Sequence, residues 1–150
     1  MGLQKRYSGY ESFSYLEPGR DYRKFELAEE IGRVPAAPLA LTADEETRVH
    51  AIVDRCLFVS MHEHAGVFPA RIEETPDYAR HGRMATAFRG LAASYWDCVF
   101  DNLMDGICMI HSSVGWQWND VLHDLGMRLC DLAHQDFVVP CLRAGDVASP

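Results

Sequence analysis

The stretch "RCLFVSMHEH", residues 55–64, decides the fold class because it joins an apolar run rich in β-forming residues to two histidines. A mostly apolar run of this length is typical of a strand that is buried on both faces in a parallel sheet. Gly66 and Pro69 follow and indicate that a loop begins where the strand ends. The stretch therefore predicts an α/β fold whose first strand ends at a pair of imidazoles.

The spacing of His62 and His64 predicts that both rings project to the same face of the strand. Side chains two residues apart share a face at about 6.5–7 Å, so Ser60 is expected on that face and Glu63 on the other. Two imidazoles on one face can bind one divalent ion at about 2.0–2.1 Å each. The pair also lies at the C-terminal end of its strand, where βα-barrel enzymes have their active sites. The alternative is that these polar residues simply begin a solvated loop, because H-x-H is common by chance.

Helical patterns follow and precede this strand. A capping box, "TADE" from Thr42, predicts a helix through about Val53. Residues 76–94 form a second candidate helix, and residues 116–135 form the clearest one, because their apolar residues recur at helical spacing. The first helix is expected to turn three apolar residues inward: Val49, Ile52 and Val53.

Two more strands are predicted, over residues 95–105 and over "FVVPCLRAG", residues 137–145, where Pro140 disfavours a central strand. Strands that alternate with helices indicate βα units and a parallel sheet. The first 41 residues have a different composition, rich in Tyr, Gly, Pro and charge. We therefore divide the chain into an extended aromatic-rich arm with a Pro-rich linker, residues 1–41, and a βα region, residues 42–150, on which the arm is expected to pack.

Composition excludes several function classes. A formal charge of −8 and a pI near 5.2 argue against a nucleic-acid partner, which requires clustered Lys and Arg. The five cysteines include no CxxC pair, which favours a reducing compartment over a disulfide framework or a zinc knuckle. No window approaches the roughly 20 apolar residues of a membrane helix, and the N-terminus lacks a secretory signal. We expect a cytoplasmic protein with no membrane segment.

Two further polar groups are weaker candidates for a site. Asp101, Asn102, Asp105 and His111 follow the second strand and could lie near the histidine pair, although turn chemistry also explains them. The long helix has a polar side that we expect to be solvated, formed by Asp120, His123, Asp124, Met127, Cys130, Asp131 and His134. The chain has no HExxH, G-x-S-x-G, GxGxxG or Walker motif.

Three stretches carry a resemblance to a known family: "SMHEHAGVFP", "GLAASYWDCVFDNLMDG" and "WNDVLHDLGMRLCDLAHQDFVV". They resemble the N-terminal part of the membrane dipeptidase (renal dipeptidase) family, in particular its bacterial branch with an N-terminal arm. The resemblance runs from about Tyr7 to the end of the chain, and the order of strands and helices fits throughout.

This resemblance implies a metal-dependent hydrolase of the amidohydrolase type, built on a (β/α)8 TIM barrel, that cleaves dipeptides at a binuclear zinc centre. The family's first strand usually ends in a His and an Asp one residue apart, both bound to metal. His62 matches the first ligand. His64 stands where the Asp is usual, which is similar to the H-x-H opening of the wider amidohydrolase superfamily. Because of this departure, metal identity and substrate do not follow from the motif.

The resemblance also implies a partial barrel. Only the first two to three βα units of a barrel of about 250 residues fit here, and the family's other ligands lie on later strands. The rest of the barrel is then expected from downstream sequence or from another chain, which includes a homo-oligomer. The alternative hypothesis is a non-catalytic subunit or interaction module derived from the same fold.

Overall fold

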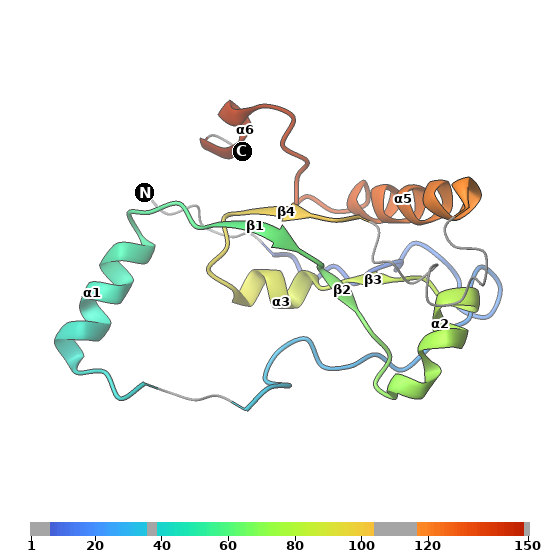
Figure 1. Ribbon diagram of the computed structural model, residues 1–150, viewed down its shortest axis with the longest axis horizontal. Helices are drawn as coiled ribbons and strands as arrows, with labels where there is room; N and C mark the ends of the chain where they lie inside the picture. The colour runs from blue at the N-terminus through green and yellow to red at the C-terminus, as the bar shows by residue number, and fades with distance from the viewer. Residues whose placement is uncertain (1–6, 36–38, 104–116, 149–150) are drawn as a thin grey trace.

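The computed structural model describes residues 7–35, 39–103 and 117–148. Figure 1 shows two strands side by side with helices around them, and a long N-terminal segment that runs beneath. The elements in chain order are α1 (Ala43–Val53), β1 (Val59–Glu63), β2 (Gly66–Val67), the 3-10 helix η1 (Ile72–Glu74), α2 (Thr75–His81), β3 (Ala85–Thr86), α3 (Phe88–Ala93), β4 (Cys98–Asp101), α5 (Trp118–Leu132) and α6 (Ala144–Ala148).

The two principal strands, β1 and β4, pair in parallel, with Val59 opposite Cys98 and Ser60 opposite Val99. This confirms a mixed α/β fold with a small parallel sheet. A short antiparallel pair, β2 with β3, adds a second sheet that the sequence did not predict. The third predicted strand is wrong, because residues 137–143 are irregular and α6 follows them. Pro140, which lacks a backbone N–H, lies in the middle of this irregular segment.

The predicted helix over residues 76–94 is broken into α2, β3 and α3. The break occurs at Gly82, where the backbone becomes extended. A Cβ atom at Gly82 would lie 2.5 Å from the Tyr78 ring, so only glycine fits there. The Tyr78 hydroxyl also accepts a 2.9 Å hydrogen bond from the Ala85 N–H, which fixes the strand that follows.

The N-terminal arm packs on the βα region, as expected for its aromatic residues. Phe13 and Phe25 are buried, and backbone bonds join Ala28 N to Phe68 O and Ala70 N to Glu26 O. The arm thus supplies part of the core instead of lying outside it. The buried apolar cluster consists of Phe13, Phe25, Val67, Tyr78, Met84, Ala85 and Met127.

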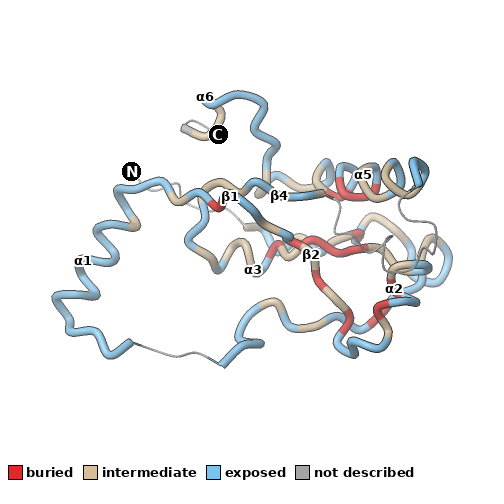
Figure 2. The backbone as a smooth tube through the Cα atoms, in the orientation of Figure 1, coloured by how far each residue is buried: buried red, intermediate tan, exposed pale blue. Residues whose placement is uncertain are grey.

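Helices α1 and α5 form over the predicted ranges, but their buried faces differ from expectation. The α1 capping box is present, yet no α1 residue is buried, and Val49 and Ile52 are exposed. Figure 2 shows α1 exposed over most of its length, and Val53 at its C-terminal end is half-buried. The buried residues of α5 are Met127, Arg128 and Asp131, so the polar side that was expected to be solvated partly faces the core.

Within the described ranges, no helix combines the length and apolar character that crossing a membrane would require.

Candidate metal centre

The two histidines of β1 and its following turn lie against each other. The Nε2 atoms of His62 and His64 are 2.8 Å apart, a hydrogen-bond distance at which one ring donates and the other accepts. The ring centroids are 4.7 Å apart and the rings are tilted by 69°. Both residues are exposed, so the pair lies at the protein surface. The structure therefore brings the two predicted ligands together, while metal binding by them stays a prediction.

The geometry of the pair fits two ligands of one divalent ion. Two nitrogens bound at about 2.0–2.1 Å in a tetrahedral arrangement lie about 3.3 Å apart. The observed 2.8 Å separation needs to open by only about 0.5 Å, which side-chain rotation of two exposed residues allows. Neutral imidazole is also a ligand that zinc binds readily. Catalytic zinc sites have three protein ligands, so the pair supplies two of them.

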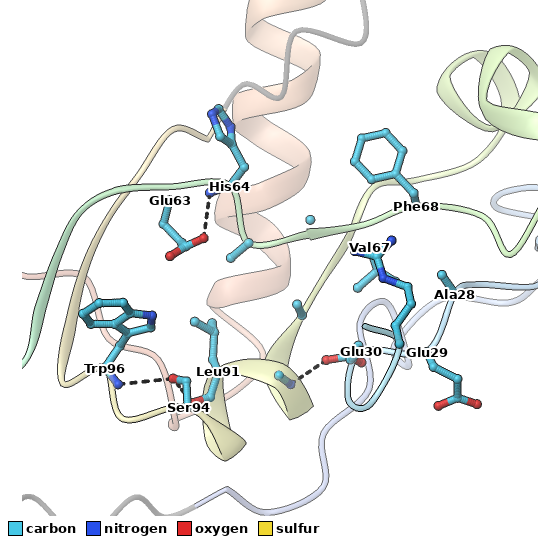
Figure 3. Close-up of a pocket in the computed structure, with 15 residues that line it drawn as sticks. Ala28, Glu29, Glu30, Glu63, His64, Val67, Phe68, Leu91, Ser94 and Trp96 are labelled. Atoms are coloured by element: carbon cyan, nitrogen blue, oxygen red, sulfur yellow. Dashed lines mark hydrogen bonds between the residues drawn. The ribbon is translucent and has the colours of Figure 1, made fainter. Parts of the chain in front are cut away.

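The strand end is irregular because β1 carries a bulge. The register changes from Ser60 opposite Val99 to Glu63 opposite Asp101, so β1 contains one residue more than β4 over this segment. The bulge shifts the alternation of side chains, and Ser60 Oγ lies 3.2 Å from Glu63 Oε2. The prediction that Ser60 and Glu63 point to opposite faces is therefore wrong. Figure 3 shows the His64 ring and the Glu63 carboxylate on opposite sides of the chain.

The expectation of two buried faces for the first strand is also wrong. Ser60 is buried, but Val59 and Met61 are exposed, with Met61 at 73%. Cys98 pairs with Val59, and Phe100 lies two residues further along β4, so all three share one face of the sheet. Phe100 is 58% exposed. One face of the parallel sheet is thus covered by its own chain, and the other is an open apolar face.

Polar residues at the end of β4 meet the end of β1, as the weaker hypothesis proposed. The Asn102 N–H donates to Glu63 O at 3.1 Å. Asp101 Oδ1 accepts from the Ala65 N–H at 3.2 Å, and Asp101 Oδ2 accepts from Arg128 Nη2 at 2.6 Å. Asp101 and Asn102 therefore stabilise the backbone around His64. Asp105 and His111 lie outside the described residues.

A pocket of about 310 Å³ adjoins His64. It lies between the arm, the segment from Glu63 to Phe68, and α3 with the residues that follow it (Figure 3). The residues that line it include Glu29, Glu30, Arg33, Glu63 and Trp96. Glu30 Oε2 also accepts the Gly90 N–H at 2.8 Å and so joins the arm to α3. The sequence did not predict this pocket, because its residues come from three distant segments.

The long helix adds no ligand to the histidine pair among the described residues. His134 is exposed and stacks on Tyr15, with 3.6 Å between ring centroids. Asp131 is fully buried and accepts hydrogen bonds from the arm. Across residues 7–35, 39–103 and 117–148, no group of three or more His, Cys, Asp or Glu side chains is placed to hold a metal ion.

Comparisons of this chain with protein-family models, with curated proteins and with solved structures return no match.

Proposed function

We propose that this chain is the N-terminal portion of a metal-dependent hydrolase of the membrane-dipeptidase type, built on a (β/α)8 barrel. One observation carries the proposal: the Nε2 atoms of His62 and His64 lie 2.8 Å apart at the C-terminal end of a strand in a parallel sheet. Enzymes of the βα-barrel class have their catalytic groups at that end of the strands. The proposed substrate is a dipeptide-like small molecule and the proposed metal is zinc, binuclear in the complete enzyme.

The residues of this chain have distinct tasks in such a site. His62 and His64 would hold one metal through their Nε2 atoms. When bound, zinc acts as a Lewis acid that polarises the scissile carbonyl and lowers the pKa of a water molecule toward about 7. Glu63 would be structural, because its carboxylate lies near the Ser60 hydroxyl and its backbone oxygen accepts the Asn102 N–H.

The open sheet face supports a contribution from further polypeptide. Parallel sheets are generally covered on both faces, yet Val59, Met61 and Phe100 are exposed here. We propose that the segments that cover this face, from downstream sequence or from another chain, also carry the remaining metal ligands. This chain alone is then not a competent dipeptidase.

The test is zinc binding by the wild-type chain and by a His62→Ala, His64→Ala double variant, measured by equilibrium dialysis with metal analysis. We expect the double variant to lose about tenfold or more in zinc affinity, because both nitrogen ligands are removed. The matched control is a His50→Ala, His123→Ala variant, which removes two exposed histidines from α1 and α5. Equal zinc binding by all three proteins would refute the metal site.

An activity measurement separates a hydrolase from a metal-binding protein without catalysis. Zinc content and dipeptide hydrolysis are measured on this chain joined to the polypeptide that completes the barrel. We expect hydrolysis to be lost in the His62→Ala, His64→Ala variant and retained in the His50→Ala, His123→Ala control. Undiminished hydrolysis in the first variant would reject the proposed mechanism.

The open apolar face also favours a second candidate, a non-catalytic subunit or interaction module. In that case the face around Met61 and Phe100 binds a partner, and the histidines are packing residues. The arm is less suited to docking, since Phe13 and Phe25 are already buried in this chain. A stable, zinc-free complex with a chain that has a full ligand set would support this candidate, and a clean monomer in size-exclusion chromatography would weaken it.

A further inference from the structure

The backbone directly after His64 is held by a carboxylate from the neighbouring strand. Asp101 Oδ1 accepts a 3.2 Å hydrogen bond from the Ala65 N–H. Because Ala65 is bonded to His64, this contact restrains the peptide from which the His64 side chain projects. The second oxygen, Asp101 Oδ2, points elsewhere and accepts from Arg128 Nη2 at 2.6 Å. The Asp101 carboxylate is therefore fixed at both oxygens.

The arginine that fixes this carboxylate is buried, with 1% of its surface exposed. Removal of a guanidinium from water is costly, and an apolar side chain of similar size generally fills such a position without that cost. The burial of this guanidinium against Asp101, with 2.6 Å between Nη2 and Oδ2, therefore points to a role in holding the carboxylate more than to a need for buried volume.

Helix α5 is itself held in place one turn further on. Asp131, which is fully buried, accepts hydrogen bonds from the Tyr10 hydroxyl at 2.7 Å and from the Phe13 N–H at 2.9 Å, both to Oδ1. Arg128 and Asp131 lie three residues apart and so share one side of the helix. One side of α5 therefore meets the arm through Asp131 and the strand end through Arg128.

From these contacts we infer that Arg128, acting through Asp101, is a positioning residue that sets the orientation of the His64 ring against His62. Arg128 acts through the carboxylate that accepts the Ala65 N–H. Asp131 has a different role, because it holds the arm and not the strand end. The inference rests on the proposed function where zinc affinity is measured. It does not depend on that function where the contact between the two rings is measured, because this contact exists without metal.

The first test measures ring contact by NMR, through nuclear Overhauser effects between the ring protons of His62 and His64. We expect the effect in the wild type and in Asp131→Asn, and its loss in Arg128→Met and Asp101→Asn. Asp131→Asn is the matched control, because it alters a buried polar residue on the same side of α5 without touching the strand end. Asp101→Asn keeps the size of the side chain but has one acceptor oxygen, which cannot bond both the Ala65 N–H and Arg128 Nη2 as the two carboxylate oxygens do. Circular dichroism verifies the helix content of each variant.

The second test measures zinc affinity by competition with a chelator. We expect Arg128→Met and Asp101→Asn to weaken zinc binding about tenfold, as is typical when a group that orients a metal ligand is removed, and Asp131→Asn to leave it unchanged. Unaltered ring contact and zinc affinity in both variants would overturn the inference. If ring contact depends on Arg128 but His62→Ala, His64→Ala leaves zinc binding intact, the inference stands and the proposed metal site fails.

Discussion

Helices α1 and α5 differ in where their stability comes from, although both form where the sequence predicts a helix. Helix α1 has a complete capping box, in which Thr42 and Glu45 bond each other's backbone N–H groups, yet none of its residues is buried. Helix α5 buries Met127, Arg128 and Asp131 and bonds both the arm and the sheet. Local sequence signals therefore predict that each helix forms. Tertiary contacts decide whether a helix also joins other segments, as α5 does and α1 does not.

The largest effect is expected at Asp131, the buried acidic residue of α5. Asp131→Ala leaves the Tyr10 hydroxyl and the Phe13 N–H without their acceptor, and a buried donor that loses its partner costs about 1–3 kcal/mol. We expect the free energy of unfolding to fall by about 2–4 kcal/mol in total. Urea denaturation followed by tyrosine fluorescence measures the change.

The control for this prediction is Asp131→Asn, which keeps an acceptor oxygen for the same two donors. It should lose less stability than Asp131→Ala. Equal losses would show that the negative charge of Asp131, and not its hydrogen bonds, holds the arm to α5.

A smaller effect is expected at Tyr10 and should depend on pH. Burial, followed by the hydrogen bond to Asp131, raises the pKa of Tyr10 well above its ordinary value. In the unfolded chain the phenol ionises at its ordinary pKa of about 10. Because the folded-state pKa is higher, the neutral phenol stabilises the fold fully below about pH 10, and this stability is lost as the pH rises toward the folded-state pKa.

The measurement compares wild type with Tyr10→Phe by urea denaturation between pH 7 and pH 11. We expect the variant to lose about 1 kcal/mol at pH 7, the typical value of a hydrogen bond, and the difference to shrink above about pH 10. A difference that stays constant with pH would show that the Tyr10–Asp131 bond is not the source of the loss.

The sequence predicted those parts of the molecule that depend on short-range patterns. The capping box of Thr42 and Glu45 predicts α1, and the apolar run before His62 predicts β1. The H-x-H spacing predicts that the two imidazole rings lie close together, as they do. What it missed depends on distant segments. The bulge before Glu63 reverses the expected face of a side chain, and no periodicity reveals it.

The polar face of α5 was misjudged for a related physical reason. Charged residues are normally solvated, so Asp131 was expected in water. Its burial depends on donors more than 100 positions away along the chain, at Tyr10 and Phe13, and the sequence pattern of the helix does not contain them. The pocket beside His64 was missed likewise, because Glu30 and Trp96 line one cavity only in the folded chain.

The smallest effect is expected on α1, at Ile52. This residue is 51% exposed, so Ile52→Ser removes little buried surface, and an exposed substitution typically changes the free energy of unfolding by less than about 0.5 kcal/mol. Urea denaturation under the same conditions as for Asp131→Ala gives the comparison directly. A loss of about 2 kcal/mol or more would mean that α1 packs its apolar side on another surface in solution, because only burial gives an isoleucine that energy. Helix α1 would then resemble α5 in depending on tertiary contacts.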